Sequence, residues 1–378
     1  MDSWDKDFFP QGIAVGTNFC NRTQEREKIH NNIMSIRPTL IISPRRYGKT
    51  SLVLYVLSEL KISFAHIDLY AELNEAEIQN SILNAIGDIL YSMEKGAQKA
   101  LQFVMDFFAD YSVGFKFSGK RIHIEFSKSK KSPAKIILDA LRKLDQTLKT
   151  KKQTVVLFFD EFQRIAQISE SHAIEAALRS IAQESKNIMF IFSGSNRNLL
   201  INLFDDYSKP LYKLCDKITL SRIEAVDYIP FIEHKFKKIW SENVTLPVIE
   251  KIMEVTEKHP YYMNVLCHKL TALKSAPTEK NVQETWHKYA LSEKTNITAE
   301  SDKLSSNQSK MLIAISKYSD LAPMAKEFIA LTGFSVSSAF QSIKVLEKMD
   351  YIQSLDNGLY LVVDPLIKYI YSVKMVGN

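Results

Sequence analysis

The sequence has few of the residues that make covalent or metal crosslinks. Its three cysteines, Cys20, Cys215 and Cys267, are odd in number, far apart, and form no Cys-x-x-Cys pair. This pattern excludes a disulfide framework and indicates a reducing compartment. The histidines show no metal-ligand spacing, and the nearest grouping, His259 with Cys267 and His268, is a weak candidate. We therefore expect neither a disulfide scaffold nor a zinc domain.

Long apolar runs are also missing. No run approaches the roughly 18 residues that cross a bilayer. The first residues, "MDSWDKDFF", are acidic and lack the basic-then-apolar pattern of a signal peptide. Hydrophobic residues nevertheless make up 46% of the 378 residues, enough for a sizeable core and two or three domains. We expect a cytoplasmic protein without membrane association.

The positive charge is concentrated in one segment. The net charge is +6, but residues 116–152 contain twelve basic and three acidic residues, which leaves −3 for the remainder of the chain. Half of these basic residues lie on or just after a predicted hairpin: Lys116, Lys120, Arg121, Lys128, Lys130 and Lys131. One hypothesis is that this insert contacts nucleic acid or an acidic partner, and the alternative is a solvated, solubilising edge.

Apolar strands alternate with helices through the first 220 residues. The runs 39–42, 154–160 and 187–195 are almost wholly apolar, as expected of strands in a parallel sheet that is covered on both faces. A fourth strand is expected at 63–69, and 112–126 alternates as a hairpin with one apolar face. Helices are expected at 23–36, 48–60, 75–91, 97–108, 133–149, 173–184 and 198–204.

The second half has a helical pattern. Helices are expected at 226–239, 247–257, 260–273 and 282–291, followed by a polar linker at 292–308. Three short helices and two strands around Asp356-Asn357-Gly358 then outline a winged helix-turn-helix. We divide the chain into a core at 1–220 with an inserted helix and hairpin unit at about 93–132, a helical lid at 221–295, and a linker with a winged helix at 296–378.

The segment "SPRRYGKTS" (43–51) resembles a phosphate-binding loop without its first glycine. The usual signature is G-x-x-x-x-G-K-[ST], in which backbone amides cradle the phosphates, Lys reaches the β- and γ-phosphates, and Ser or Thr binds Mg²⁺. Pro44 keeps Ser43 extended, so a glycine is dispensable there but is needed at Gly48. The predicted nucleotide-binding residues are Ser43, Pro44, Arg45, Arg46, Tyr47, Gly48, Lys49, Thr50 and Ser51.

Acidic and polar residues follow the next two buried strands. Asp160, at the end of its strand, is predicted to hold Mg²⁺ together with Thr50, and Glu161 to orient and deprotonate the attacking water. Ser195, Asn196 and Arg197 follow the strand at 187–195 and are candidates for sensing the γ-phosphate. The alternative is a polar turn that opens the next helix.

These segments, together with "NFCNRTQE" (18–25) and "KHPYYMNVLCHKL" (258–270), resemble the prokaryotic archaeal-type ATPase family of the AAA+/STAND group. The resemblance implies an α/β fold: a three-layer P-loop NTPase core of the ASCE type, a helical lid and a C-terminal winged helix. It also implies ATP and Mg²⁺ as cofactors and a nucleotide-dependent conformational switch.

The resemblance assigns further positions. It places Asn21, Arg22 and Glu25 on the adenine side of the pocket, although Arg22 and Glu25 could be only a helix-surface pair. Pro260 matches the lid proline, and Lys258 stands where this group commonly has glycine. The Gly-Ala-Arg sensor of ordinary AAA+ lids is missing. For an arginine finger the chain offers only two guesses, Arg179 and Arg222, so the oligomeric state stays open.

Two functions are compatible with these residues. The first is a Mg²⁺-dependent ATPase that acts as a molecular switch, with Lys49 and Glu161 as its catalytic residues. The second is a nucleotide-binding scaffold or DNA-associated protein in which hydrolysis is incidental. The expected recognition helix, 336–349, would turn Val336, Phe340, Ile343 and Leu346 inward. The outward residues would be Ser337, Ser338, Gln341, Ser342, Lys344 and Lys348.

The C-terminal region is a weak candidate for DNA binding. Residues 304–378 contain seven lysines, no arginine and six acids. DNA binding depends strongly on neutralising phosphates. A protein-interaction or autoinhibitory role is therefore at least as well supported for this region as DNA recognition.

Overall fold

The computed structural model describes residues 8–372 except 112, 119–120, 127–130, 170 and 356, and only the backbone of 115–118, 121–123 and 125–126. The chain divides into two compact units. One comprises residues 22–45 and 49–220, here called the N-terminal unit. The other, the C-terminal unit, comprises residues 221–378 together with 1–21 and the short loop segment 46–48. Each is described by itself.

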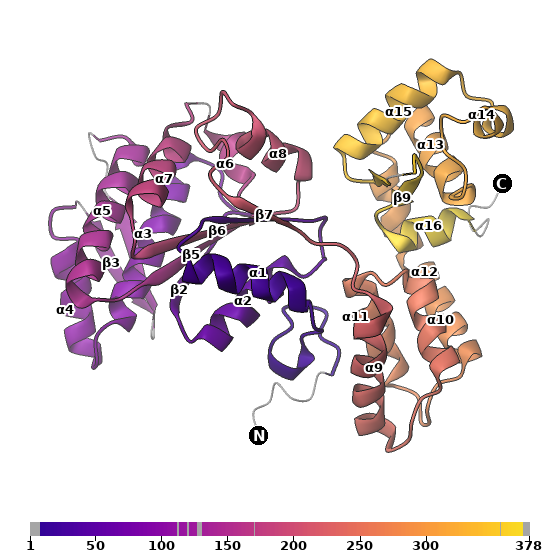
Figure 1. Ribbon diagram of the computed structural model, residues 1–378, viewed down its shortest axis with the longest axis horizontal. Coiled ribbons are helices and arrows are strands. Elements are labelled where there is room, and N and C mark those ends of the chain that lie inside the picture. The colour runs from indigo at the N-terminus through magenta and orange to yellow at the C-terminus, as the bar shows by residue number, and fades with distance from the viewer. Residues whose placement is uncertain are drawn as a thin grey trace. The chain divides into compact units, whose positions relative to one another are not determined.

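A five-stranded parallel sheet forms the centre of the N-terminal unit (Figure 1). Its order is β2-β5-β6-β1-β7. The strands are β1 (Thr39–Ile42), β2 (Ser63–Asp68), β5 (Val155–Asp160), β6 (Ile188–Gly194) and β7 (Asp216–Thr219). All residues of the three central strands are buried, which agrees with the apolar runs. Strand β7 was not predicted because this short edge strand is mostly exposed and polar.

Helices line the sheet. α1 (Thr23–Met34) and α2 (Lys49–Leu60) pack against each other, and α5 (Pro133–Lys151) packs between α3 (Glu75–Ser92) and α7 (Ala173–Glu184) (Figure 1). The others are α4 (Ala97–Phe107), α6 (Arg164–Ile168) and α8 (Arg197–Asp205). The α/β fold class with its parallel sheet is therefore confirmed.

The predicted hairpin is present as β3 (Val113–Ser118) and β4 (Arg121–Phe126), paired antiparallel. It is attached to α3 through Asn84: the Ile124 amide donates to Asn84 Oδ1 at 2.7 Å, and Asn84 Nδ2 donates to the Ile124 carbonyl at 3.4 Å. The side chain of Ile124 is buried. The Asn84 side chain thus forms the two backbone hydrogen bonds that a neighbouring strand would otherwise form with Ile124.

Most of the basic insert lies outside the described residues. This applies to Lys120, Lys128 and Lys130 and to the side chains of Lys116 and Arg121. Among the basic side chains that the structure describes, Lys131 pairs with Asp139 at 3.2 Å. Four others also pair with acids of this unit: Lys135 with Asp139, Arg142 with Glu184, Lys143 with Asp110, and Lys151 with Glu94. Binding of nucleic acid here stays a prediction.

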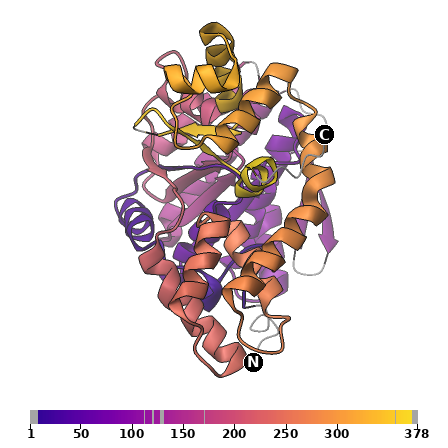
Figure 2. The ribbon, with the colours of Figure 1, turned by 90° about the vertical axis from the view of Figure 1, so that its right-hand side faces the viewer.

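Four helices begin the C-terminal unit: α9 (Ala225–Trp240), α10 (Leu246–Thr256), α11 (Pro260–Leu270) and α12 (Glu279–Ser301). The first three match the predicted helices within a few residues. Trp286 of α12 and Phe236 of α9 are fully buried in a core that continues into the C-terminal elements. Figure 2 shows α12 along its length.

The predicted linker at 292–308 is wrong over most of its length. α12 continues to Ser301, and α13 (Ser306–Lys317) opens with a capping box formed by its N-cap Ser305 and by Gln308 in its first turn. The segment is polar because most of its helix surface is exposed, and it contains neither glycine nor proline to end the helix. The domain boundary drawn at 296 therefore falls inside a helix.

The last elements are α14 (Lys326–Thr332), α15 (Val336–Lys348), β8 (Ile352–Ser354), β9 (Tyr360–Val362) and α16 (Pro365–Ser372). The predicted order, three helices followed by an antiparallel strand pair, is present. Its assignment as a winged helix stays a prediction. Among the described residues, no single helix is long and apolar enough to cross a membrane. In the described part of the chain, only α14 and α15 together, bent by 93°, reach that length and hydropathy.

The predicted inward face of α15 is partly wrong. Ile343 and Leu346 are buried, but Val336 and Phe340 are 59% and 54% exposed. The buried stripe instead contains the small residues Ala339 and Ser342, the latter predicted to face outward. α15 packs closely against α13, and small side chains suit such an approach. The outward face is therefore more apolar than expected.

Candidate nucleotide-binding site

The loop between β1 and α2 has the conformation expected from its sequence. Arg46 and Gly48 take left-handed φ angles of 65° and 85°, whereas Ser43 does not. Ser43 is fully buried, and its hydroxyl donates to the Pro44 carbonyl at 3.0 Å. A Cβ atom at Gly48 would meet nothing within 4 Å, so the requirement for glycine there comes from the backbone angle. The missing first glycine is structurally unnecessary.

Lys49 lies inside this loop. It is the first residue of α2, is 6% exposed, and its ammonium donates to the carbonyls of Ser43 at 3.3 Å and Pro44 at 3.2 Å. In phosphate-binding loops the equivalent lysine reaches the β- and γ-phosphates. The geometry therefore holds a buried positive charge at the place where a polyphosphate would bind.

Thr50 and Asp160 are in direct contact. Thr50 Oγ1 donates to Asp160 Oδ2 at 2.5 Å, the Ser193 hydroxyl donates to Oδ1, and His66 Nε2 lies 3.6 Å from Oδ2. Burial raises the pKa of Asp160, but the bonds from His66, Ser193 and Thr50 and the charge of Lys49 outweigh it and lower the pKa to about 2. Asp160 is therefore a carboxylate at any physiological pH.

The donor set suits Mg²⁺. One hydroxyl and one ionised carboxylate are side by side, and Mg²⁺ commonly takes one or two protein oxygens while phosphates and water complete its shell. Within the described part of the chain, no group of three or more His, Cys, Asp or Glu is placed to hold a metal by itself. Thr50 and Asp160 would thus hold the ion only together with a nucleotide.

Glu161 is held by two side chains. Its Oε2 accepts from Ser195 Oγ at 2.7 Å and from Gln163 Nε2, and its backbone takes a left-handed φ of 51°. Backbone strain of this kind is concentrated at functional sites. Gly194 lies against the same amide: a Cβ atom there would be 2.0 Å from Gln163 Oε1. The catalytic carboxylate predicted from the sequence is therefore fixed in direction.

Sequence reasoning missed His66 and Gln163. Gln163 follows Glu161 by two residues, and His66 lies in a strand that was predicted. What could not be seen is that β2 and β5 are neighbours, which brings His66 to Asp160 and stacks its ring on Phe158 with centroids 4.8 Å apart. The sequence did contain one signal: His66 is a polar residue in the predicted strand that neighbours the strand ending in Asp160.

The residues after β6 have different roles. Ser195 bonds Glu161, but Asn196 caps α8, because its Oδ1 accepts from the Leu199 amide at 3.1 Å. For Asn196 the structure thus supports the alternative, a polar residue that opens a helix. Arg197 is the half-buried first residue of α8.

The adenine-side candidates are divided between the two units. Arg22 is 4% exposed and pairs with Glu25 at 3.2 Å in the N-terminal unit. In the C-terminal unit the Asn21 amide donates to the Asp227 carboxylate. The Arg22–Glu25 pair anticipated as an alternative is therefore real, with Arg22 buried and Glu25 partly exposed. Contact with adenine stays a prediction.

Pro260 is the first residue of α11, as expected of a proline that opens a helix. Lys258, at the position where glycine is common in the resembled group, takes a φ of 59°. Its ammonium pairs with Glu224 at 2.8 Å. The left-handed backbone that glycine favours is thus preserved with a lysine in its place.

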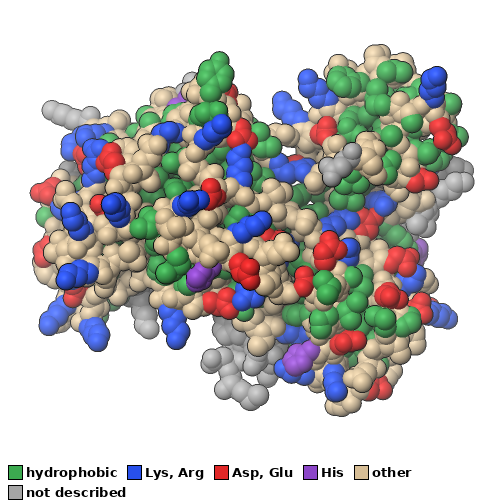
Figure 3. All heavy atoms as spheres, in the orientation of Figure 1, with side chains coloured by type: hydrophobic (Ala, Val, Ile, Leu, Met, Phe, Trp, Pro, Cys, Tyr) green, Lys and Arg blue, Asp and Glu red, His purple; other side chains and the backbone are tan. Residues whose placement is uncertain are grey.

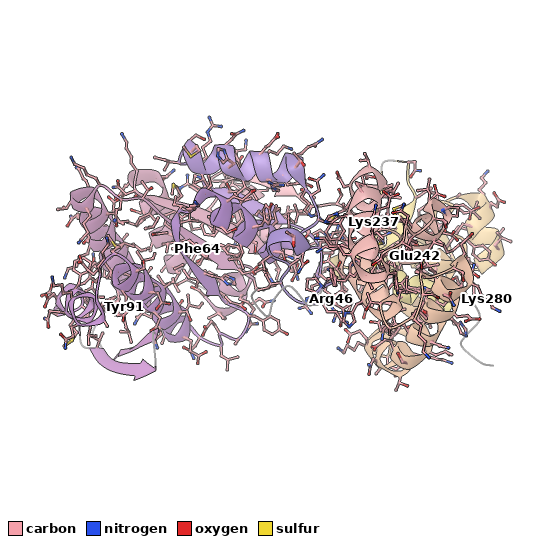
Figure 4. All side chains as sticks on the ribbon, turned by 90° about the horizontal axis from the view of Figure 1, so that it is seen from below. Arg46, Phe64, Tyr91, Lys237, Glu242 and Lys280 are labelled. Atoms are coloured by element: carbon pink, nitrogen blue, oxygen red, sulfur yellow. The ribbon has the colours of Figure 1, made fainter. Side chains whose placement is uncertain are left out.

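Within the C-terminal unit, α11 contacts the loop segment 46–48. The Arg46 guanidinium lies 4.4 Å above the Tyr261 ring, and the Tyr47 ring meets His259 edge-on at 4.8 Å (Arg46 is labelled in Figure 4). His259 is buried, and burial first, with Arg222 and Arg46 adding to it, lowers its pKa from 6.5 to about 3. The imidazole is therefore neutral.

Both arginine-finger guesses have partners. Arg179 donates to the carbonyls of Pro210 and Tyr212, the latter at 3.0 Å. Arg222 pairs with Glu257 and donates to the carbonyls of residues 362 and 363 at 3.3 and 3.4 Å. Neither guanidinium is presented for a second molecule, so neither supports an arginine-finger role.

Comparison with known proteins agrees with this geometry. Two solved structures are similar in fold. The Walker-type ATPase of Pyrococcus abyssi is 18% identical with a TM-score of 0.67, covering 96% of this chain and 99% of that one. The Aeropyrum pernix ORC2 protein, solved in ADPNP–ADP complexes, is 13% identical with a TM-score of 0.57, covering 98% and 99%. No curated protein sequence matches. Residues 19–266 match the ATPase domain family found predominantly in Archaea, and the chain belongs to that family.

Proposed function

We propose that the protein binds ATP with Mg²⁺ at the loop 43–51, hydrolyses it, and uses the nucleotide state as a STAND-like switch. The contact between Thr50 Oγ1 and Asp160 Oδ2 is the observation that carries the proposal. It joins the first turn of α2 to the end of β5, which is where a P-loop and an acidic strand end would share a cation.

In this proposal each side chain of the site has a separate role in binding or hydrolysis. The backbone amides before α2 would receive the phosphates, with Lys49 moving from its two carbonyl partners to the phosphate oxygens. Thr50 and Asp160 would hold Mg²⁺, which neutralises charge on the phosphates. Glu161, fixed by Ser195 and Gln163, would hold the attacking water and accept its proton.

The remaining assignments belong to the same proposal. Ser195 and Arg197 would respond to loss of the γ-phosphate. Asn21, Arg22 and Glu25 would contact the base, and Pro260 would aim the start of α11 at the nucleotide.

The C-terminal unit offers a route for the switch. Arg46 and Tyr47 belong to the phosphate loop, and they contact Tyr261 and His259 of the α11 end. The hydroxyl of the adjacent Tyr262 donates to Asp364, just before α16, at 2.7 Å. A change at the loop would thus reach the C-terminal helices through packed aromatic rings.

Two variants test the proposal. Glu161→Gln keeps the size of the side chain but removes the base, so we expect ATP binding by calorimetry to be retained and phosphate release to be nearly abolished. Lys49→Ala should lose binding. Equal turnover by wild type and Glu161→Gln would favour the other function, a nucleotide-binding scaffold or DNA-associated protein. The absence of binding heat with ATP and Mg²⁺ would refute the proposed site.

A further inference from the structure

The C-terminal elements contain a groove of about 450 Å³ between α13, the end of α14 and the start of α15. Its lining combines apolar and basic side chains, chiefly Ile313, Leu331, Phe334, Lys310, Lys317 and Ser338. The volume lies in the range that accommodates specific ligands. The phosphate loop and its partners contribute none of the lining residues, so this groove is separate from the candidate nucleotide site.

The apolar wall of the groove is partly open to solvent. Leu331 is 55% exposed, and Ile313 and Phe334 are half-buried. Figure 3 shows hydrophobic side chains on the surface over α14 and α15. Val336 and Phe340 of α15 are exposed as well, but helical spacing turns them away from Ser338, so they belong to another face of the helix. Single exposed apolar residues are ordinary, but apolar side chains gathered in an exposed groove indicate an interaction site.

Two lysines line the groove. Lys310 and Lys317 are seven residues apart, on the same face of α13. Both are exposed, and among the described residues neither forms an ion pair with an acid. These basic side chains are thus available to carboxylates of a partner.

We propose that this groove binds an acidic amphipathic helix of a protein partner. Apolar residues on one face of that helix would enter the groove against Leu331 and Ile313, and flanking Asp or Glu would pair with Lys310 and Lys317. Duplex DNA fits less well, because Val336 and Phe340 occupy the outer face at the start of α15, and residues 304–378 contain seven lysines, no arginine and six acids.

Peptide display on the full chain tests this inference. A library of random 16-residue peptides is selected on immobilised wild-type protein, and enriched peptides are measured in solution by fluorescence anisotropy. We expect enriched sequences with apolar residues at helical spacing and an excess of Asp and Glu. In wild type, hydrogen exchange of residues 307–345 should slow when such a peptide binds.

Variants locate the binding surface. Leu331→Ser, and separately Lys310→Glu with Lys317→Glu, should each weaken the enriched peptides by about tenfold or more. Two exposed residues of α12 serve as matched controls: Leu291→Ser and Lys280→Glu, the latter labelled in Figure 4, should leave affinity unchanged.

Three results would overturn the inference. The first is no enrichment of peptides above the empty support. The second is enriched peptides that bind the groove variants as tightly as wild type or leave exchange at residues 307–345 unchanged. The third is binding of duplex DNA or anionic vesicles, but not peptide, that the same variants abolish. None of these readouts needs ATP turnover, so they are independent of the proposed function.

Discussion

Replacing Gly194 with alanine is expected to disturb the clamp on Glu161 without altering any charged residue. The added Cβ would lie 2.0 Å from Gln163 Oε1, 3.2 Å from its Cδ and 3.0 Å from Leu200 Cδ1. Atoms this close must separate. Since Gln163 is 5% exposed, its amide has little room to move without leaving Glu161. The backbone at Gly194 is not left-handed, so the effect comes from crowding alone.

The magnitude follows from overpacking and a lost buried hydrogen bond. Overpacking of a core typically costs about 1–3 kcal/mol, and a lost bond to a charged group is of similar size. For a unit of this size about 2 kcal/mol lowers the melting temperature by roughly 4–8 °C. We also expect ATP turnover to fall while ATP binding persists, because Lys49 and Thr50 are untouched. Melting is followed by circular dichroism and turnover by phosphate release.

A second substitution and a control make the test specific. Adding Gln163→Ala removes the crowded amide, so the double variant should recover most of the melting temperature but not the turnover. Gly87→Ala places a Cβ 2.9 Å from the terminal methyl of Ile124, a contact that a small side-chain shift relieves, in a helix that prefers alanine, and should be close to neutral. Normal melting of Gly194→Ala, or no recovery in the double variant, would refute the reasoning.

Three further outcomes are expected from buried polar groups. In the His259→Asn variant, the melting temperature should fall less steeply below pH 6.5 than in wild type. The wild-type imidazole stays neutral to about pH 3 in the fold but takes up a proton in the unfolded chain, so acid favours unfolding. A melting series from pH 7 to 4 measures how steeply the melting temperature falls. Tyr262→Phe should lower the free energy of unfolding by about 1–3 kcal/mol, since Oδ2 of the buried Asp364 loses the hydroxyl that donates to it; denaturant titration measures it. Asn84→Ala should cost a similar 1–3 kcal/mol and speed hydrogen exchange at the Ile124 amide.

Most of the N-terminal fold could be predicted because its strands are continuous apolar runs. β1, β5 and β6 are buried throughout, and a run without polar residues is compatible only with a covered parallel sheet or a buried helix. β7 has one buried residue in four, so its sequence has no such signal; it forms through pairing with β1. Edge strands of this kind depend on partners far away in the sequence.

The candidate site was predictable where one motif contains the chemistry. Two short motifs contain the chemistry, one with Lys49 and Thr50 and the other with Asp160 and Glu161. The local rule for a residue before proline also predicted the conformation of Ser43 correctly. The residues that orient the carboxylates could not be predicted in the same way, because the position of His66 beside Asp160 depends on which strands are neighbours in the sheet. The inward face of α15 failed for a related reason: a helix pattern cannot distinguish apolar residues that pack inside from apolar residues that stay exposed.

The unbroken course of α12 has a mechanical consequence. A helix of 23 residues spans roughly 35 Å, and it joins the helical region to α13 with only four residues between them. A flexible tether would dissipate a rotation of α11, whereas a stiff rod delivers it to its far end as a larger displacement. Inserting glycines near residue 296 should therefore weaken this link and leave the shared core and the Tyr262–Asp364 hydrogen bond as the remaining connection to the last elements.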